Sequence, residues 1–352
     1  IGGYPVLTWE SQVRAWREAE PTYLLAKDLP HSLQDHVNNM PLDFRQSDQA
    51  RILFEALIDD ASDNEPHAPK IEVWDNDIGL ETTPPWEFVY TNEMWYSENV
   101  PPPDLKNLQS CGCIGRCDPK SKTCSCVNKQ YSFLKPFAKE GLIPRTWDGS
   151  GFLYNRSGKL QLHGYPIFEC NQFCGCDEDC PNRVVQNGRQ CVISINNTKE
   201  KGWGVFAGPK KIPKGTYIGI YAGELLTEKE GDDRGVYYNK FGRTYLFYID
   251  YFYLENEPAH FVVDAYHAGN FTRFLNHSCD PNCALEACYI NEGNIRKPLL
   301  AIFTVCDVEP YEELCFSYFG EVGEDDEEVI PQKDAVYAEC RCGSKNCRGR
   351  MF

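Results

Sequence analysis

Nine cysteines stand close together in the middle of the chain, in two groups separated by residues 127–169. They are Cys111, Cys113, Cys117, Cys124, Cys126, Cys170, Cys174, Cys176 and Cys180. Disulfide pairing would leave one thiol over, and the C-x-C and C-x3-C spacings favour a polymetal site. Zinc takes four ligands per ion, so three ions need twelve sulfur contacts. Nine thiolates supply them when six bind one ion and three bridge two, so the sequence predicts a metal cluster here.

Three further segments carry side chains suited to binding or catalysis. They are Gly202-Trp-Gly-Val-Phe206, Arg273-Phe-Leu-Asn-His-Ser-Cys-Asp-Pro-Asn282 and Glu312-Glu-Leu-Cys-Phe-Ser-Tyr318. Taken singly, each has an ordinary structural explanation. Glycines at a strand start often mark a turn, an Asn276-His277 pair can be a satisfied core network, and Tyr318 can be a core residue with a bonded hydroxyl. A last cysteine group, Cys340-x-Cys342-x4-Cys347, lies near the end of the chain.

Short β-type segments must position these residues. We expect strands at 191–195, 204–207, 217–221, 244–251, 261–265, 300–304 and 313–318, and a short helix at 224–229. Strands this short, with so many turns, indicate several small sheets rather than a parallel α/β sheet. Residues 1–60 read as helical, with one helix from Thr8 to Glu20 and another capped by Ser47. Residues 83–92 are extended and lead into the cysteines.

The composition indicates a folded protein with an acidic surface: 352 residues, 42% of them hydrophobic, and a formal charge of −17. No apolar run approaches the roughly 18 residues of a membrane span, so we expect no membrane segment. Scattered cysteines fit a reducing compartment; they are Cys191, Cys283, Cys288, Cys306 and Cys315. The net charge favours basic partners and argues against direct nucleic-acid binding, although residues 129–159 have basic character.

Together and in this order, the segments closely resemble the SET-domain protein lysine methyltransferases, in the heterochromatin-type histone H3 lysine-9 subfamily. The resemblance covers about residues 83–352. It implies a mainly β SET fold of several small sheets with short helices and a pseudoknot. The implied parts are a helical extension (1–80), a pre-SET segment with a three-zinc cluster (81–190), the SET catalytic domain (191–319), an acidic loop (320–339) and a zinc-binding post-SET segment (340–352).

The resemblance also implies S-adenosylmethionine as the methyl donor. The cofactor-binding residues it assigns are Gly202, Trp203, Gly204, Tyr245, Arg273, Asn276, His277, Tyr318 and Phe352. Tyr318 and Tyr245 would line an aromatic channel that desolvates the target lysine and lowers its pKa from about 10.4. Phe316, the third catalytic assignment, stands where a tyrosine favours monomethylation, which predicts a di- or trimethylating enzyme. Two departures are Ser317, where an aspartate is usual, and Ala268, where a tyrosine is usual.

Cys279 is assigned as the fourth ligand beside Cys340, Cys342 and Cys347, which gives four structural zinc ions in all. The resemblance implies action in the nucleus on lysine 9 of histone H3, with the basic H3 N-terminal tail as substrate and heterochromatin proteins as partners. Two alternatives stay open. One is a methyltransferase for another histone or non-histone lysine; the other is a zinc-stabilised chromatin scaffold with a decayed cofactor pocket, for which Ser317 and Ala268 are the evidence.

Overall fold

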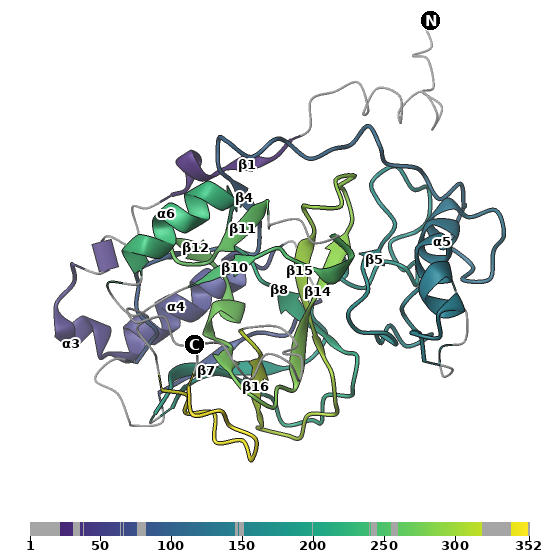
Figure 1. The fold of residues 1–352 in the computed structure, drawn as a ribbon. Coiled ribbons are helices and arrows are strands. Elements are labelled where there is room, and N and C mark those ends of the chain that lie inside the picture. Colours follow the sequence, from purple (N-terminus) through teal and green to yellow (C-terminus); the bar gives the residue numbers. More distant parts are fainter. Residues whose placement is uncertain are drawn as a thin grey trace, which may run out of the picture.

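The described part of the chain is mainly β, with a few short helices (Figure 1). The computed structural model describes residues 22–30, 36–37, 39–63, 65, 67–75, 82–144, 147, 151–198, 200–238, 240, 245–254, 260–318 and 339–350. The expected helix from Thr8 to Glu20, residues 320–338 of the acidic loop, and Phe352 lie outside these residues. No described helix has the length and apolar character needed to cross a membrane.

The largest sheet has nine strands and carries most of the candidate site. Its main path runs β2 (Glu72–Trp74), β6 (Ile193–Thr198), β7 (Gly202–Ala207), β16 (Glu313–Phe316), β14 (Cys283–Tyr289), β15 (Leu299–Thr304) and β8 (Tyr217–Ile220). Two short strands join it from the side: β13 (Asn276–His277) pairs with β16, and β5 (Ile167–Phe168) pairs with β14. Segments far apart in the sequence therefore meet at β16.

Two smaller sheets complete the β structure. One runs in the order β1 (Leu24–Leu25), β4 (Trp95–Tyr96), β9 (Glu224–Thr227), β11 (Phe261–Asp264) and β10 (Leu246–Tyr248). The other joins β12 (Ala268–Gly269) to β3 (Val89–Tyr90) in parallel. The extended lead-in predicted at 83–92 thus supplies a strand of its own. The fold class of several small sheets is confirmed.

The helices pack against the sheets, and α6 lies over three neighbouring strands, β9, β11 and β10. They are α3 (Leu42–Arg45), α4 (Asp48–Asp60), α5 (Ser125–Lys139) and α6 (Glu228–Tyr238), with 3-10 turns η1 (Ala26–Asp28), η3 (Phe252–Leu254) and η4 (Phe271–Phe274). The predicted Ser47 cap is confirmed, because its hydroxyl accepts from the Ala50 N–H. Phe54 of α4 meets Trp86 edge to face, with ring centroids 5.1 Å apart, so α4 packs into the main core.

The helix predicted at 224–229 is wrong over its first four residues. Residues 224–227 form β9, and α6 begins only at Glu228. Leu225 and Leu226 are almost fully buried, in register with Val263 and Val262 of β11. Burial of both leucines in the sheet outweighs the helical tendency of the polar residues that follow.

Candidate active site and metal centres

Tyr318 lies where β13 and β16 run side by side. Asn276 is in register with Cys315, and His277 with Phe316. The Tyr318 N–H donates to His277 Nδ1 at 3.2 Å, and its hydroxyl donates to the Leu275 carbonyl at 2.9 Å. Burial, and then the neighbouring Tyr245 phenol, raise the pKa of Tyr318 well above its usual value. The phenol therefore stays protonated and acts as a hydrogen-bond donor.

Aromatic rings surround this tyrosine. The Phe316 ring lies 5.0 Å from the Tyr318 ring, and the Tyr221 ring lies 6.3 Å from that of Phe316. The Tyr221 hydroxyl donates to the Tyr245 carbonyl at 3.0 Å. The structure thus brings together all three residues predicted to be catalytic, with Tyr221 as the link between them.

Arg273 lies behind Tyr245. Its guanidinium carbon is 4.3 Å from the centre of the Tyr245 ring and 4.0 Å from that of Phe88. Its Nε donates to the Ala265 carbonyl at 2.9 Å, and only 5% of the residue is exposed. These contacts hold the Tyr245 ring from one side. They make Arg273 a positioning residue, and its predicted contact with the cofactor stays a prediction.

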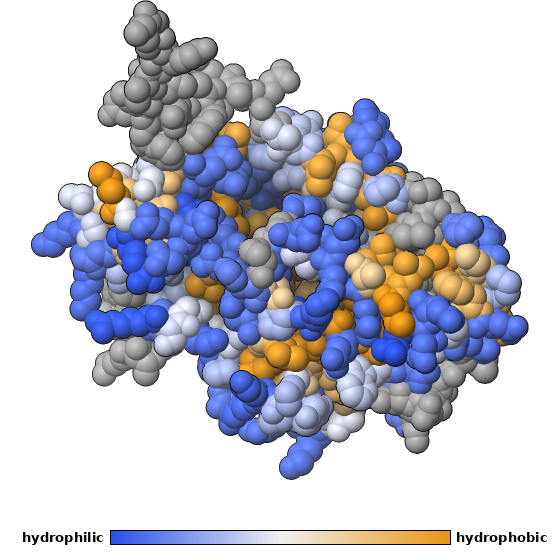
Figure 2. All heavy atoms as spheres, turned by 180° about the vertical axis from the view of Figure 1, so that it is seen from behind, coloured by the Kyte–Doolittle hydropathy of each residue, from blue (hydrophilic) through white to orange (hydrophobic). Residues whose placement is uncertain are grey.

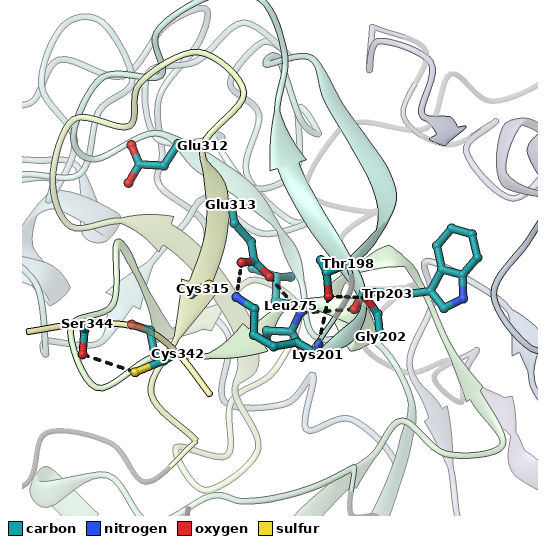
Figure 3. A network of polar contacts seen from close by, with 12 residues as sticks. Thr198, Lys201, Gly202, Trp203, Leu275, Glu312, Glu313, Cys315, Cys342 and Ser344 are labelled. Atoms are coloured by element: carbon teal, nitrogen blue, oxygen red, sulfur yellow. Dashed lines mark hydrogen bonds and ion pairs between the residues drawn. The ribbon is translucent and has the colours of Figure 1, made fainter. Parts of the chain in front are cut away.

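A second polar network surrounds the predicted glycine pair (Figure 3). Asn276 Nδ2 donates to the Trp203 carbonyl at 3.2 Å and to Glu313 Oε1 at 2.8 Å. Glu313 also forms an ion pair with Lys201. The Trp203 indole points away from this network (Figure 3).

Each glycine of the pair is required for its own reason. Gly202 has a φ of +74°, a conformation that costs a side chain strain. A Cβ on Gly204 would lie 2.8 Å from Glu313 Oε1 and 3.0 Å from Asn276 Nδ2. A side chain there would displace the Glu313 carboxylate or the Asn276 amide from the network, and the bare backbone also suits close approach by a ligand.

The nine central cysteines form one buried cluster. Three sets of thiols in it have all their Sγ atoms within 4.8 Å of one another: Cys111, Cys117, Cys170 and Cys176; Cys113, Cys117 and Cys124; and Cys126, Cys170 and Cys174. Cys180 packs in the same cluster. No described cysteine forms a disulfide. Thiols gathered this closely fit thiolate-bound zinc, and Cys117 and Cys170 each belong to two sets, as bridging ligands must.

Hydrogen-bond donors surround the thiols. The Cys111 N–H lies 3.2 Å from Cys174 Sγ, and Asn182 Nδ2 lies 3.6 Å from Cys170 Sγ. Arg183 brings one guanidinium nitrogen to 3.4 Å from Cys176 Sγ. Such donors offset the negative charge of metal-bound thiolates. Sequence spacing gave no sign of Asn182 or Arg183.

The predicted C-terminal site is also assembled. Cys279 Sγ lies 3.8 Å from Cys340 Sγ, and with Cys342 and Cys347 the four thiols lie within 4.8 Å of one another. His277 Nε2 is 3.5 Å from Cys279 Sγ, while the same ring accepts from Tyr318 through Nδ1. The His277 side chain therefore connects this metal site to the aromatic site.

Sequence reasoning missed three contributors to the aromatic site: Tyr221, the Leu275 carbonyl and Phe88. Tyr221 lies at the end of a predicted strand, where nothing in the local pattern marks it as more than a core residue. Phe88 belongs to the extended lead-in, far from the site in sequence. Glu313, by contrast, lies within the predicted Glu312–Tyr318 segment and could have been found there.

Two family models match the chain: the Pre-SET motif over residues 63–183 and the SET domain over residues 202–319. A histone-lysine N-methyltransferase specific for H3 lysine 9, from Cryptococcus neoformans, is 38% identical, over 86% of this chain and 20% of its own length. The human histone-lysine N-methyltransferase SUV39H2 is 34% identical, over 86% of this chain and 67% of its own length.

A solved structure shares the fold. KRYPTONITE, in a complex with mCHH DNA, an H3(1–15) peptide and S-adenosylhomocysteine, has a TM-score of 0.62 and 26% identity, over 80% of this chain and 51% of its own. The fold and the two family matches define a SET-domain protein with a preceding Pre-SET motif. The chain belongs to the SET-domain histone-lysine N-methyltransferases. It spans only a fifth of the length of the Cryptococcus relative.

Proposed function

We propose that this chain is an S-adenosylmethionine-dependent methyltransferase that modifies lysine 9 of histone H3. The observation that carries the proposal is the aromatic site itself. The protonated Tyr318 hydroxyl is fixed by the Leu275 carbonyl, and the Phe316 ring packs between Tyr318 and Tyr221. Tyr221 in turn donates to the Tyr245 carbonyl. Family membership supports the same chemistry.

The site can prepare an amine for methyl transfer without a carboxylate base. Aromatic walls exclude water from the target lysine and so lower its pKa, which favours the neutral amine needed as nucleophile. The proton leaves to solvent before the lysine is enclosed. Tyr318 holds its own proton, so it orients the amine and the methyl group rather than accepting a proton.

The Gly202–Gly204 segment at the start of β7 and Asn276 are the residues proposed to hold the cofactor. Gly204 leaves its backbone bare beside the Glu313 carboxylate and the Asn276 amide, and Asn276 fixes the Trp203 carbonyl next to it. When bound, S-adenosylmethionine would supply an electrophilic methyl group. KRYPTONITE, a protein of the same fold, was solved with the demethylated cofactor.

The histone tail is proposed to bind as an added strand on β10. Within its sheet β10 has a described partner on one side only, β11. An extended peptide can pair with such an edge. The acidic charge of −17 attracts a basic tail, and KRYPTONITE was solved with an H3 peptide. We further propose a nuclear location, with heterochromatin proteins as partners.

The metal sites are proposed to hold about four zinc ions, three in the central cluster and one bound by Cys279 and the C-terminal cysteines. Cys117 and Cys170 are proposed as two of the three bridging thiolates, because each belongs to two sets of neighbouring thiols. All these ions are structural: they hold the chain in place and take no part in methyl transfer.

A methyl-transfer assay on H3 tail peptides tests the function. We expect transfer to the unmodified peptide and none when only lysine 9 is replaced by arginine. Tyr318→Phe should reduce kcat by about 10²-fold or more, because the oriented hydroxyl oxygen is lost from the reacting centre, with unchanged circular dichroism. Transfer that persists after lysine 9 is replaced would point to another lysine. No transfer to any peptide would favour the scaffold alternative.

A further inference from the structure

The charge of the chain is distributed very unevenly. Residues 105–168 contain ten lysines and arginines but only three aspartates and glutamates, whereas the rest of the chain contains 25 basic and 49 acidic residues. A three-zinc, nine-thiolate cluster carries a charge of about −3. That charge is smaller than the basic surplus of this segment. The segment that includes α5 is thus positive within an acidic protein.

Most of these basic side chains are exposed and have no acidic partner. The exposed ones are Lys106, Arg116, Lys120, Lys122, Lys129, Lys135, Lys139 and Arg156. Among them, only Arg116 forms an ion pair with a described carboxylate, that of Asp179 at 3.1 Å. Exposed acidic residues would ordinarily be interspersed on such a surface. Their scarcity leaves the positive charge available to a partner.

Helix α5 gathers part of this charge on its outer side. It has no acidic residue, and its buried side consists of Cys126, Val127, Gln130 and Leu134. Lys135 and Lys139 lie one turn apart on the exposed side, about 6 Å along the axis. Asn128 Nδ2 donates to the Lys122 carbonyl at 3.1 Å, which holds the preceding turn against the helix. We call Lys122, Lys135 and Lys139 the α5 basic face.

The α5 basic face belongs to a helix that packs against the turn following the proposed tail-binding strand, β10. Phe137 of α5 lies 5.9 Å from Phe252 and Phe133 lies 5.7 Å from Tyr253, ring centre to ring centre. Phe252 and Tyr253 belong to η3, which follows β10. Figure 1 shows α5 at one side of the molecule, across from α3. A histone tail in a nucleosome is tethered close to wrapped DNA, so a surface near the bound tail can meet DNA.

We propose that the α5 basic face contacts the phosphate backbone of a DNA duplex beside the substrate tail, without regard to base sequence. The net charge argues against nucleic acid for the chain as a whole, but charges are screened beyond about 8 Å at physiological salt. DNA at α5 therefore meets the local lysines rather than the distant acidic surface. The link to the tail rests on the proposed function; the DNA contact itself does not.

The experiment compares two double variants of the zinc-loaded protein, Lys135→Gln with Lys139→Gln and, as the matched control, Lys210→Gln with Lys214→Gln. The control lysines are exposed and lie outside the basic segment. Binding to a 20-base-pair duplex is measured across a salt series, and kcat/KM is measured on an H3 peptide and on nucleosomes. The α5 variant should lose roughly tenfold in DNA affinity. The slope of log K against log salt concentration should become shallower by about two, one unit for each lost phosphate contact.

The α5 variant should also lose roughly tenfold in kcat/KM on nucleosomes while keeping its rate on the peptide. The control variant should keep its DNA affinity and its rates on both substrates. Equal DNA binding by both variants would overturn the proposal. A lower kcat/KM on nucleosomes with unchanged DNA binding would also overturn the proposal. It would indicate that the α5 basic face contacts an acidic protein surface instead. If the wild-type protein methylates no peptide, the proposed function fails, while the duplex binding still decides the DNA contact.

Discussion

At the level of single residues, the hydrogen bonds that Tyr318 forms limit the chemistry that its hydroxyl can perform. Its hydroxyl is already donated to the Leu275 carbonyl at 2.9 Å, and burial keeps its pKa above the usual value. A phenol in this state cannot take a proton from lysine at neutral pH. It can offer its oxygen lone pairs to the C–H groups of a bound methyl, which are weak donors. The proton must therefore leave by solvent, which makes the desolvating rings as important as the hydroxyl.

Substitution of Phe316 tests whether the space around the methylated amine determines how many methyl groups are added. Its ring is 4% exposed and lies between Tyr221 and Tyr318. In Phe316→Tyr the added hydroxyl would crowd a methylated amine, so we expect products to shift from di- and trimethyl-lysine towards monomethyl-lysine. A mass-spectrometric time course on the H3 peptide measures this shift. The rate of first methyl addition serves as the internal control, and an unchanged product distribution would contradict the role given to Phe316.

At the level of elements, the sequence predicted most strands and the Ser47 helix because each has its own apolar pattern. The central strand β14 was not predicted. It contains Glu286, which a local pattern places at the surface. In the fold that carboxylate is buried, 2.8 Å from His163 Nδ1 and 2.8 Å from the Gly164 N–H. These partners lie far away in sequence, so no local signal could justify burying the charge.

The residues of the candidate site also fall into two classes: those that the sequence predicts and those whose role only the fold reveals. The cysteines, glycines and Tyr318 could be found because their spacing and type are distinctive. Tyr221 and Arg273 take their roles from distant contacts: Tyr221 bonds the Tyr245 carbonyl, and Arg273 stacks on Phe88 from the lead-in. The sequence around a tyrosine or an arginine does not predict such a distant partner. Only the assembled sheets show which rings these two residues support.

Helix α4 is expected to brace the lead-in on which Phe88 lies. Phe54 is 2% exposed and packs on Trp86, so Phe54→Ala should lower the free energy of unfolding by about 3–5 kcal/mol. Ile52 lies on the same helix but is 58% exposed. Ile52→Ala is the control, with an expected change of about 0.5 kcal/mol or less. Denaturant titration of both variants measures the difference, and equal losses would show that α4 does not brace the core.

At the level of the whole molecule, the two groups of thiols have different tasks. The central cluster packs mainly sulfur, with Val127 and Phe152, where other parts of the chain have a hydrophobic core. The C-terminal group instead joins the end of the chain to Cys279, whose sulfur is 3.5 Å from the imidazole that accepts from Tyr318. The first therefore maintains the fold, and the second shapes the site.

This division predicts different outcomes for Cys279→Ser and Cys170→Ser. Cys279→Ser removes one ligand of the C-terminal group, so the zinc content should fall from about four to about three ions per chain, and methyl transfer should be lost with little change in thermal unfolding. Cys170 belongs to two thiol sets of the central cluster. Cys170→Ser should therefore lower the zinc content further and unfold the pre-SET segment.

Metal analysis, calorimetry and the peptide assay, run on the same preparations, separate the two. Chelation of the wild-type protein should reproduce the Cys279→Ser state first and the Cys170→Ser state later, because the C-terminal thiols are more exposed than those of the central cluster. If Cys279→Ser kept full activity with about three zinc ions, the C-terminal group would only be holding the end of the chain. Its contact with His277 would then have no part in shaping the site.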